Sequence, residues 1–212
     1  GIEEALGKDF QGKLAMWQVI ARVVDQGSRL SGVRLAQVHA VGGVLDMKRG
    51  FDENDLYGNL AWLAENQGKI EQKLFESRRG EKKPKLFLYD VTSSYLEGEQ
   101  NHFGKYGYNR DGKKGKKQIV IGLLCDEQGE AVSTEVFAGN TQDIQTFIPQ
   151  VRKGAERFGC KDVTIVGDRG MIKTLHIEQL PEGFHYIVSE RKRTFCKSAR
   201  AIFFLPRDHF KI

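Results

Sequence analysis

The sequence contains little cysteine, little proline and no long apolar run, and each shortage excludes a class of protein. It has 3 cysteines and 4 prolines in 212 residues. The cysteines are widely spaced and odd in number, and no Cys-x-x-Cys or closely spaced His pair occurs, which excludes a disulfide framework and a zinc site. No stretch approaches the roughly 18 to 20 consecutive apolar residues of a membrane span, and the N-terminus lacks the basic and apolar regions of a signal peptide. We therefore expect a cytoplasmic protein with no membrane partner.

The charge is mildly positive. Lys and Arg number 33 against 28 Asp and Glu, which gives a formal net charge of +5 and a pI near 9.0. This balance favours a polyanionic partner only weakly, so the distribution of the charge matters more than its sum. The length is sufficient for one large domain, or for one domain with a helical appendage.

Residues 1–80 have apolar side chains at helical spacing and predict a run of amphipathic helices. One helix is expected over 14–24, a second over 33–41 with Gly42 and Gly43 as its stop, and a third from an acidic start at 52–55 to about residue 78. The Gly-containing turn at 26–32 has two interpretations, a DNA-binding helix-turn-helix or a helical packing layer. Residues 77–85 predict a linker into the next part of the chain.

Two short apolar runs each stop on an acid. Leu86 to Asp90 and Val163 to Asp168 are rich in β-branched and aromatic residues, so each predicts a buried strand that ends on a carboxylate. Between them we expect two further strands, over 118–125 and 131–137, and a helix from 144 to 158. After them we expect a short helix near 173–180 and a strand at 184–188.

This order, β-β-β-α-β-α-β, predicts an α/β fold with a mixed sheet of the ribonuclease-H-like type, preceded by the helical segment. In such a sheet the first strand is central and the fourth lies beside it. That arrangement would bring Asp90 and Asp168 together although 78 positions separate them.

Two neighbouring carboxylates favour a metal site. At 4 Å they repel by about 4 kcal/mol with an effective dielectric constant near 20, so they need protons, cations or basic groups between them. Oxygen-only ligands on rigid strands select Mg²⁺ or Mn²⁺. A pair of such ions about 3.5 to 4 Å apart can cleave a phosphodiester, which is the chemistry that Asp90 and Asp168 indicate.

Other polar residues near these strands have two interpretations each. Thr92 either caps a turn or contacts a phosphate, and Arg169 either neutralises a scissile phosphate or pairs with a surface acid. Asn140, Thr141 and Asp143 are typical of a helix N-terminus, where capping explains most of them, but that terminus can also line the site.

The segment between the first two strands has the strongest binding signal. Its basic residues are Lys105, Arg110, Lys113, Lys114, Lys116 and Lys117. Like charges at this density predict an exposed loop. The interleaved tyrosines and the position one strand from Asp90 favour contact with DNA phosphates over a merely solvated loop.

Four motifs together resemble a known family. They are Tyr89–Tyr95, Gln118–Leu123, Glu135–Asp143 and Val166–Met171. In order and spacing they are similar to the bacterial insertion-sequence transposases of the DDE class, in the branch with a β-rich insertion between the second Asp and the final Glu, and the resemblance spans residues 50–194. It implies a ribonuclease-H-like catalytic core, two divalent metal ions, and cutting and joining of DNA.

The resemblance also implies roles for residues and partners. Asp90 matches the first metal-binding acid and Asp168 the second, and Arg169 matches the residue that follows the second acid. The implied partners are the element's terminal inverted repeats, the target DNA and a second copy of the chain in a homodimer. The implied location is the bacterial cytoplasm.

One family feature is missing from the 212 residues. The third acid of the family is a Glu within a Tyr-x-x-Arg-x-x-x-Glu-x-x-x-x-x-x-Lys signature, which does not occur here, and residues 195–212 show no family pattern. We therefore expect a helical segment over 1–80, a partial catalytic core over 81–194, an unassigned tail, and a transposase fragment that is inactive alone. The alternatives are another ribonuclease-H-like nuclease, such as a junction resolvase, and a non-catalytic DNA-binding remnant.

Overall fold

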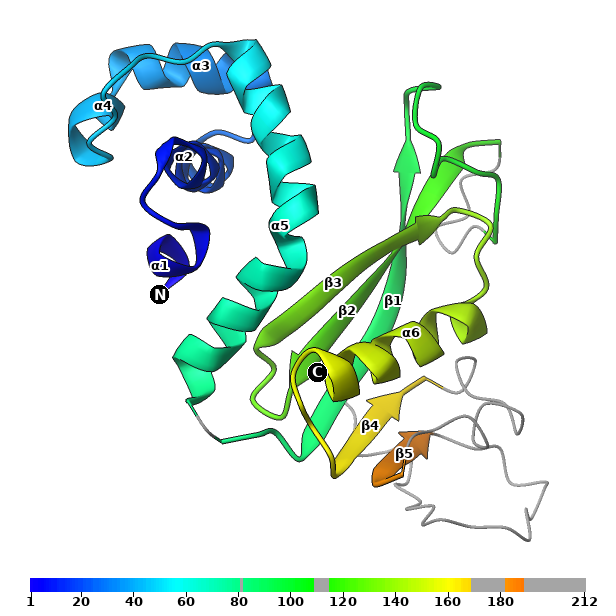
Figure 1. Ribbon diagram of the computed structural model, residues 1–212. Helices are drawn as coiled ribbons and strands as arrows, with labels where there is room; N and C mark the ends of the chain where they lie inside the picture. The colour runs from blue at the N-terminus through cyan, green and yellow to red at the C-terminus, as the bar shows by residue number, and fades with distance from the viewer. Residues whose placement is uncertain (81, 109–114, 169–181, 189–212) are drawn as a thin grey trace, which may run out of the picture. The chain divides into compact units, whose positions relative to one another are not determined.

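The computed structural model describes residues 1–80, 82–108, 115–168 and 182–188 (Figure 1). The chain divides into two compact units, Gly1–Glu81 and Lys82–Ile212. The first is helical, and the second contains a sheet with one described helix.

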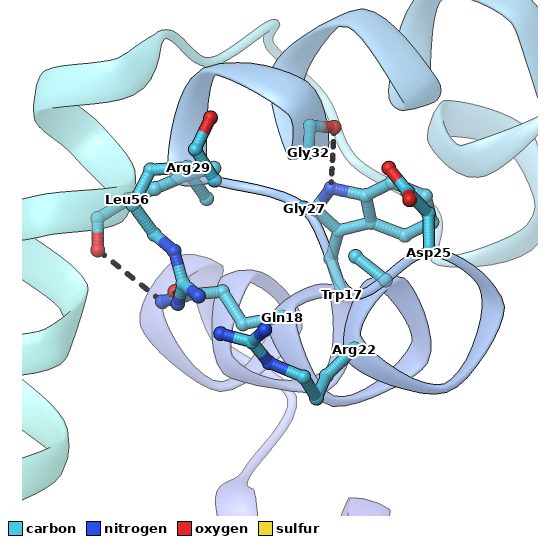
Figure 2. A pocket seen from close by; sticks show the side chains of 10 residues that line it. Trp17, Gln18, Arg22, Asp25, Gly27, Arg29, Gly32 and Leu56 are labelled. Carbon is cyan, nitrogen blue, oxygen red and sulfur yellow. Dashed lines mark hydrogen bonds between the residues drawn. The ribbon is translucent and has the colours of Figure 1, made fainter. Parts of the chain in front are cut away.

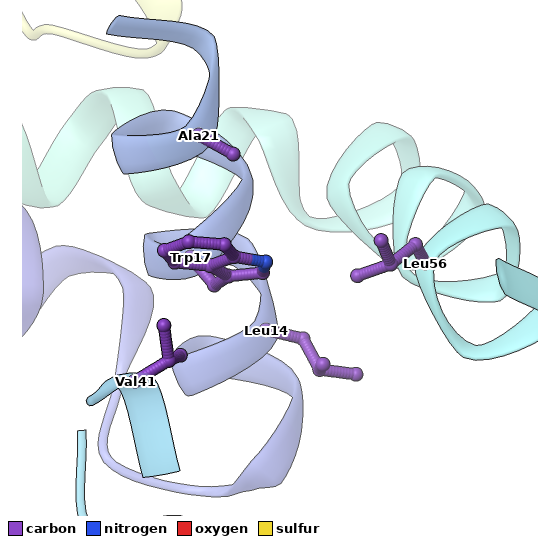
Figure 3. Close-up of a cluster of buried hydrophobic side chains, with 5 residues drawn as sticks. All are labelled: Leu14, Trp17, Ala21, Val41 and Leu56. Atoms are coloured by element: carbon purple, nitrogen blue, oxygen red, sulfur yellow. The ribbon is translucent and has the colours of Figure 1, made fainter. Parts of the chain in front are cut away.

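The helical unit contains five helices among the described residues. They are α1 (Ile2–Leu6), α2 (Phe10–Val24), α3 (Arg29–Val38), α4 (Val41–Val44) and α5 (Glu53–Arg79). Leu14, Trp17 and Ala21 recur at intervals of three and four on α2, so they share one face, and Val41 and Leu56 complete the buried cluster (Figure 3). The acidic start predicted for the long helix is confirmed: Asp52 is the N-cap of α5, and its Oδ1 accepts a hydrogen bond from Asp55 N at 2.9 Å.

The predicted second helix had the wrong limits. It begins at Arg29 because the Ser28 hydroxyl accepts a hydrogen bond from Ser31 N at 3.1 Å and caps it. The helix ends at Val38, and Gly42 and Gly43 lie inside α4 instead of stopping the helix. The Trp17 indole donates to the Gly32 carbonyl at 3.2 Å, which ties α3 to α2 as a packed helical layer.

The second unit is built on a mixed sheet. Its strands are β1 (Leu86–Leu96), β2 (Lys117–Asp126), β3 (Ala131–Ala138), β4 (Val163–Gly167) and β5 (Phe184–Val188). Their order is β3-β2-β1-β4-β5, with β1 antiparallel to β2 and parallel to β4. The predicted ribonuclease-H-like arrangement, with the first strand central and the fourth beside it, is therefore confirmed. The short helix expected near 173–180 lies outside the described residues.

The first strand is longer than the sequence predicted. It does not end on Asp90 but continues to Leu96, so Asp90 lies within the strand instead of at its exit. Burial alternates from Phe87 to Thr92, because one face of the sheet is covered and the other is open. An acid on the open face remains solvated and does not stop the strand.

Helix α6 (Asp143–Glu156) covers the buried face (Figure 1). Phe147 and Val151 are buried on it, and the Tyr89 and Phe147 rings lie 6.3 Å apart. At the outer strand, Lys153 Nζ donates to Ser133 Oγ at 2.9 Å and pairs with Glu135 of β3. These contacts fix α6 across β1, β2 and β3.

The helices were also compared in length and apolar character with a membrane span. Within the described residues, none of them combines the length and the apolar character that crossing a bilayer requires.

Candidate functional site

Asp90 and Asp168 each directly follow the last pair of residues matched between the parallel strands β1 and β4. The register pairs Tyr89 of β1 with Gly167 of β4, and each Asp is the next residue along its chain. Adjacent strands lie about 4.8 Å apart, so the register brings the two backbones to neighbouring positions at one edge of the β1–β4 pair. The structure thus brings together the two acids that the sequence singled out.

The Asp90 side chain is on the open face of the sheet. Tyr89 is buried against α6 and donates its hydroxyl to the Thr146 carbonyl at 3.3 Å, and successive strand residues point to opposite faces. Asp90 is exposed, and its Oδ1 accepts a hydrogen bond from Val91 N at 2.8 Å. Its cross-strand neighbour is Leu123, which is 40% exposed. The carboxylate therefore has lone pairs directed at solvent beside an apolar side chain.

The chemistry of this donor pair fits a hard divalent cation. Both Asp90 and Asp168 are exposed, and their oxygens are the ligand type that Mg²⁺ and Mn²⁺ take in proteins. Across the described part of the chain, no group of three or more His, Cys, Asp or Glu side chains is arranged to hold a metal ion.

The other predicted site residues are distributed on both sides of the sheet. Thr92 is exposed two residues beyond Asp90, on the same open face. Asn140 and Thr141 lie in the turn before α6, and the expectation that they cap the helix is wrong: Gln142 is the N-cap, and its N–H donates to Gln145 Oε1 at 3.2 Å. Arg169 lies outside the described residues.

Asp143 is the first residue of α6 and belongs to the covered side. Burial is the main cause that raises the pKa of Tyr89 to about 12, and the charges of Asp143, Glu135 and Asp90 add to it. Asp143 lies one turn before Thr146, whose carbonyl accepts the hydrogen bond of the Tyr89 hydroxyl. The first-turn acid stabilises the helix N-terminus, in agreement with the structural interpretation.

Gly122, the cross-strand partner of Val91, makes room for the Tyr89 ring. A Cβ added to Gly122 would lie 2.5 Å from Tyr89 Oη and 3.1 Å from Cε2. Only glycine fits there without a shift of the ring that immediately precedes Asp90. Neither the sequence pattern nor the motif reading assigned Gly122 this role.

The basic segment is only partly described. Arg110, Lys113 and Lys114 lie outside the described residues, whereas Lys105, Lys116 and Lys117 lie at the two ends of the segment. Lys116 pairs with Glu97 at 2.8 Å, and this hydrogen bond raises the pKa of Lys116. Lys105 and Gln118 exchange backbone hydrogen bonds of 3.1 and 2.9 Å, which fixes the start of the segment against the start of β2.

The structural role of the Gln118 side chain was not predicted from the sequence. Its side chain is 5% exposed and donates from Nε2 to the carbonyls of Tyr108 and Gly139, at 3.0 and 2.9 Å. A polar residue at the start of an apolar run was the only signal, and it does not specify a partner.

The helical unit contains a small hollow that offers no ligand site (Figure 2). Its cavity volume is about 10 Å³, close to that of one water molecule. Arg29 donates to Gln18 Oε1 at 2.5 Å, and Gln18 donates to the Leu56 carbonyl at 3.2 Å and to Asn59 Oδ1 at 2.8 Å. The polar groups satisfy one another and stabilise the packing of α2, α3 and α5.

Comparison with protein families identifies the second unit. The sequence profile of the transposase DDE domain matches residues 81–209. The chain belongs to this family. The match begins at the boundary between the units and extends past residue 194, so the family pattern of this DDE transposase domain runs further than the motifs alone indicate. A comparison with curated protein sequences gave no match.

Solved structures with similar folds include two transposase complexes. The piggyBac transposase synaptic complex with hairpin DNA has 13% sequence identity and a TM-score of 0.48, and the match covers 87% of this chain and 42% of that chain. The Mos1 strand transfer complex has 10% identity and a TM-score of 0.33, with 85% of this chain and 58% of that chain covered. The DDE transposase chain described here therefore spans about half the length of each.

Proposed function

We propose that this protein is the catalytic region of an insertion-sequence transposase, and that Asp90 and Asp168 bind Mg²⁺ or Mn²⁺ to cut and join DNA at the element's ends. The observation that supports the proposal most is the register of β1 and β4, in which Tyr89 pairs with Gly167, the residues that immediately precede Asp90 and Asp168. The family assignment supports the reaction class.

The divalent ions would supply activation of a water or sugar hydroxyl and stabilisation of the leaving oxygen at a phosphodiester. The chain's own contribution is to hold the carboxylates and to orient the DNA. Pairing with β2 fixes the backbone of Asp90 on one side, the pairing with β4 ends at the preceding Tyr89, and Val91 N holds one carboxylate oxygen, which leaves the other for a ligand. Arg169 would offset charge on the scissile phosphate, and Lys105 and Lys117 would bind flanking phosphates.

Two acids are fewer than this chemistry needs. Because the sequence contains no Tyr-x-x-Arg-x-x-x-Glu signature, we propose that the chain binds metal weakly and does not complete transposition alone. Action on paired terminal repeats by a homodimer, in a bacterial cytoplasm, is part of the same proposal.

Calorimetric titration with Mn²⁺ tests the metal site without requiring activity. The unaltered chain should bind Mn²⁺ in the millimolar range, and Asp90→Asn and Asp168→Asn should each abolish the binding heat. Glu65→Gln removes an exposed carboxylate from α5 in the helical unit and should bind as the unaltered chain does. Absence of binding at millimolar Mn²⁺ would refute the site.

Cleavage of labelled terminal-repeat DNA with Mn²⁺ tests the reaction class. We expect weak cutting at most, and none from Asp90→Ala. Robust cutting that survives this substitution would refute the assignment of Asp90.

The basic segment favours a second candidate, a DNA-binding protein that occupies element ends without cutting them. Lys105 and Lys117 flank a run of further Lys and Arg residues, and phosphate contacts by these residues would make the affinity fall steeply with salt. Salt-dependent DNA binding combined with no metal-dependent cutting would favour this candidate.

A further inference from the structure

Two tyrosines project into solvent where the basic segment leaves the sheet. Tyr106 is 66% exposed and Tyr108 is 85% exposed, whereas Tyr89 and Tyr186 of the same unit are buried. They flank Gly107, directly after Lys105. Two large aromatic rings therefore face water next to the positive charge of Lys105.

The backbone beneath these rings is held at several points. Lys105 pairs with Gln118 through two backbone hydrogen bonds, and Gly139 N donates to the Phe103 carbonyl at 2.9 Å. The Gln118 side chain donates to the Tyr108 carbonyl, so the stretch is tied on both sides of Tyr106. The rings are thus carried by fixed backbone, which reduces the entropy lost on binding.

Close backbone contacts at Gly107 and Gly139 fix which side of residues 106–108 faces the sheet. A Cβ on Gly107 would lie 1.9 Å from the Gly139 carbonyl oxygen, and a Cβ on Gly139 would lie 1.9 Å from the Gln118 carbonyl oxygen. The side-chain position of Gly107 therefore faces inward against the β2–β3 end. The neighbouring Tyr106 and Tyr108 side chains are directed outward, which agrees with their exposure.

We propose that Tyr106 and Tyr108 are stacking platforms for unpaired DNA bases at the site where the strands are cut or joined. The inference rests on the proposed function and specifies the form of DNA that the site takes. In a duplex the base faces are already stacked on one another, so an aromatic ring gains little from them. An unpaired base offers its whole face, and Lys105 and Lys117 offer charge to its phosphates.

The location suits a strand that passes the acids. Gln118 pairs with Tyr95 of β1, five residues beyond Asp90. At about 3.4 Å per residue this is about 17 Å along the strand, which an unpaired strand of about five nucleotides or fewer can span, since a duplex rises about 3.4 Å per nucleotide and an unpaired strand can extend further. A few unpaired nucleotides next to the scissile phosphate would reach both places.

Fluorescence anisotropy measures the preference. A labelled mixed-sequence oligonucleotide is titrated with the full chain, once single-stranded and once annealed to its complement, at the same low salt concentration. The double variant Tyr106→Ala, Tyr108→Ala should weaken single-strand binding by about tenfold or more and duplex binding by less than about twofold. The double Tyr→Phe variant keeps the rings and should bind as the unaltered chain does. Tyr57→Ala removes a 53% exposed tyrosine from α5 and should have no effect.

The outcomes separate this inference from the proposed function. Equal loss for single-stranded and duplex DNA, or no loss for either, would refute stacking while leaving the metal site intact. Retention of Mn²⁺ binding in the Tyr106→Ala, Tyr108→Ala protein shows that the acids are unaffected. If the unaltered chain binds neither DNA, both proposals fail.

Discussion

Replacing Gly122 with alanine perturbs the strand that carries Asp90 without touching the acid. The new Cβ would lie 2.5 Å from Tyr89 Oη and 3.1 to 3.2 Å from two ring carbons. Tyr89 is 2% exposed and its hydroxyl is bonded to the Thr146 carbonyl, so the ring has little room to move. The methyl must therefore displace Tyr89 or separate β1 from β2.

The expected magnitude follows from these contacts. Overpacking costs about 1 to 3 kcal/mol, and loss of the Tyr89 hydrogen bond adds about 1 kcal/mol. Replacing glycine in a strand returns about 0.5 to 1 kcal/mol. We expect Gly122→Ala to lower the free energy of unfolding by about 2 kcal/mol. Tyr89→Phe removes the oxygen that lies closest, so the double variant should be about 1 kcal/mol more stable than the sum of the single changes predicts.

Hydrogen exchange of β1 and β2 amides measures this free energy within the sheet. Both tryptophans, Trp17 and Trp62, lie in the helical unit, so their fluorescence checks separately that this unit stays folded. Strictly additive effects of Gly122→Ala and Tyr89→Phe would refute the steric argument, and so would a Gly122→Ala protein as stable as the unaltered one.

Two further predictions concern the covered face of the sheet. Because burial raises the pKa of Tyr89 to about 12, the unfolded chain loses this proton first, and stability present below pH 10 should fall by about 1.4 kcal/mol per pH unit between about pH 10 and 12. Alkaline denaturation of Tyr89→Phe should show a smaller fall, and an identical fall would contradict the assignment. Gln150 is 1% exposed and neither side-chain amide atom has a hydrogen-bond partner within the described residues, so Gln150→Met should raise the urea midpoint by the equivalent of about 1 kcal/mol. A lower midpoint would show that the amide is satisfied.

Local patterns predicted the strands themselves, because each is encoded by a run of residues close in sequence, and their order in the sheet followed from the ribonuclease-H-like topology. The predicted first strand was too short because an acid within an apolar run commonly marks its end. Asp90 does not end β1, since it lies on the open face of the sheet, and the local pattern does not indicate that this face is open. Ser28 is a residue type that commonly caps a helix, so the start of α3 at Arg29 was also predictable from the sequence.

Contacts between distant segments could not be predicted in this way. Gln118 bonds to carbonyls 10 and 21 residues away, and its residue type indicates neither partner. Gly122 and Gly139 are small because another backbone or ring approaches them, and that approach exists only in the fold. The neighbouring positions of Asp90 and Asp168 followed from the topology, whereas the contacts around them did not.

The central place of β1 has a consequence for the order in which the site is assembled. Its antiparallel partner β2 follows by a connection of 20 residues, whereas its parallel partner β4 comes much later, with Asp168 78 positions after Asp90. Contacts between distant segments form late, because closing the long loop between them costs chain entropy before the contacts can stabilise the fold. During synthesis, Asp90 leaves the ribosome long before its partner exists. A nascent chain therefore contains a nearly complete hairpin before β4 docks, and the positions of Asp90 and Asp168 become neighbours only when β4 pairs with β1.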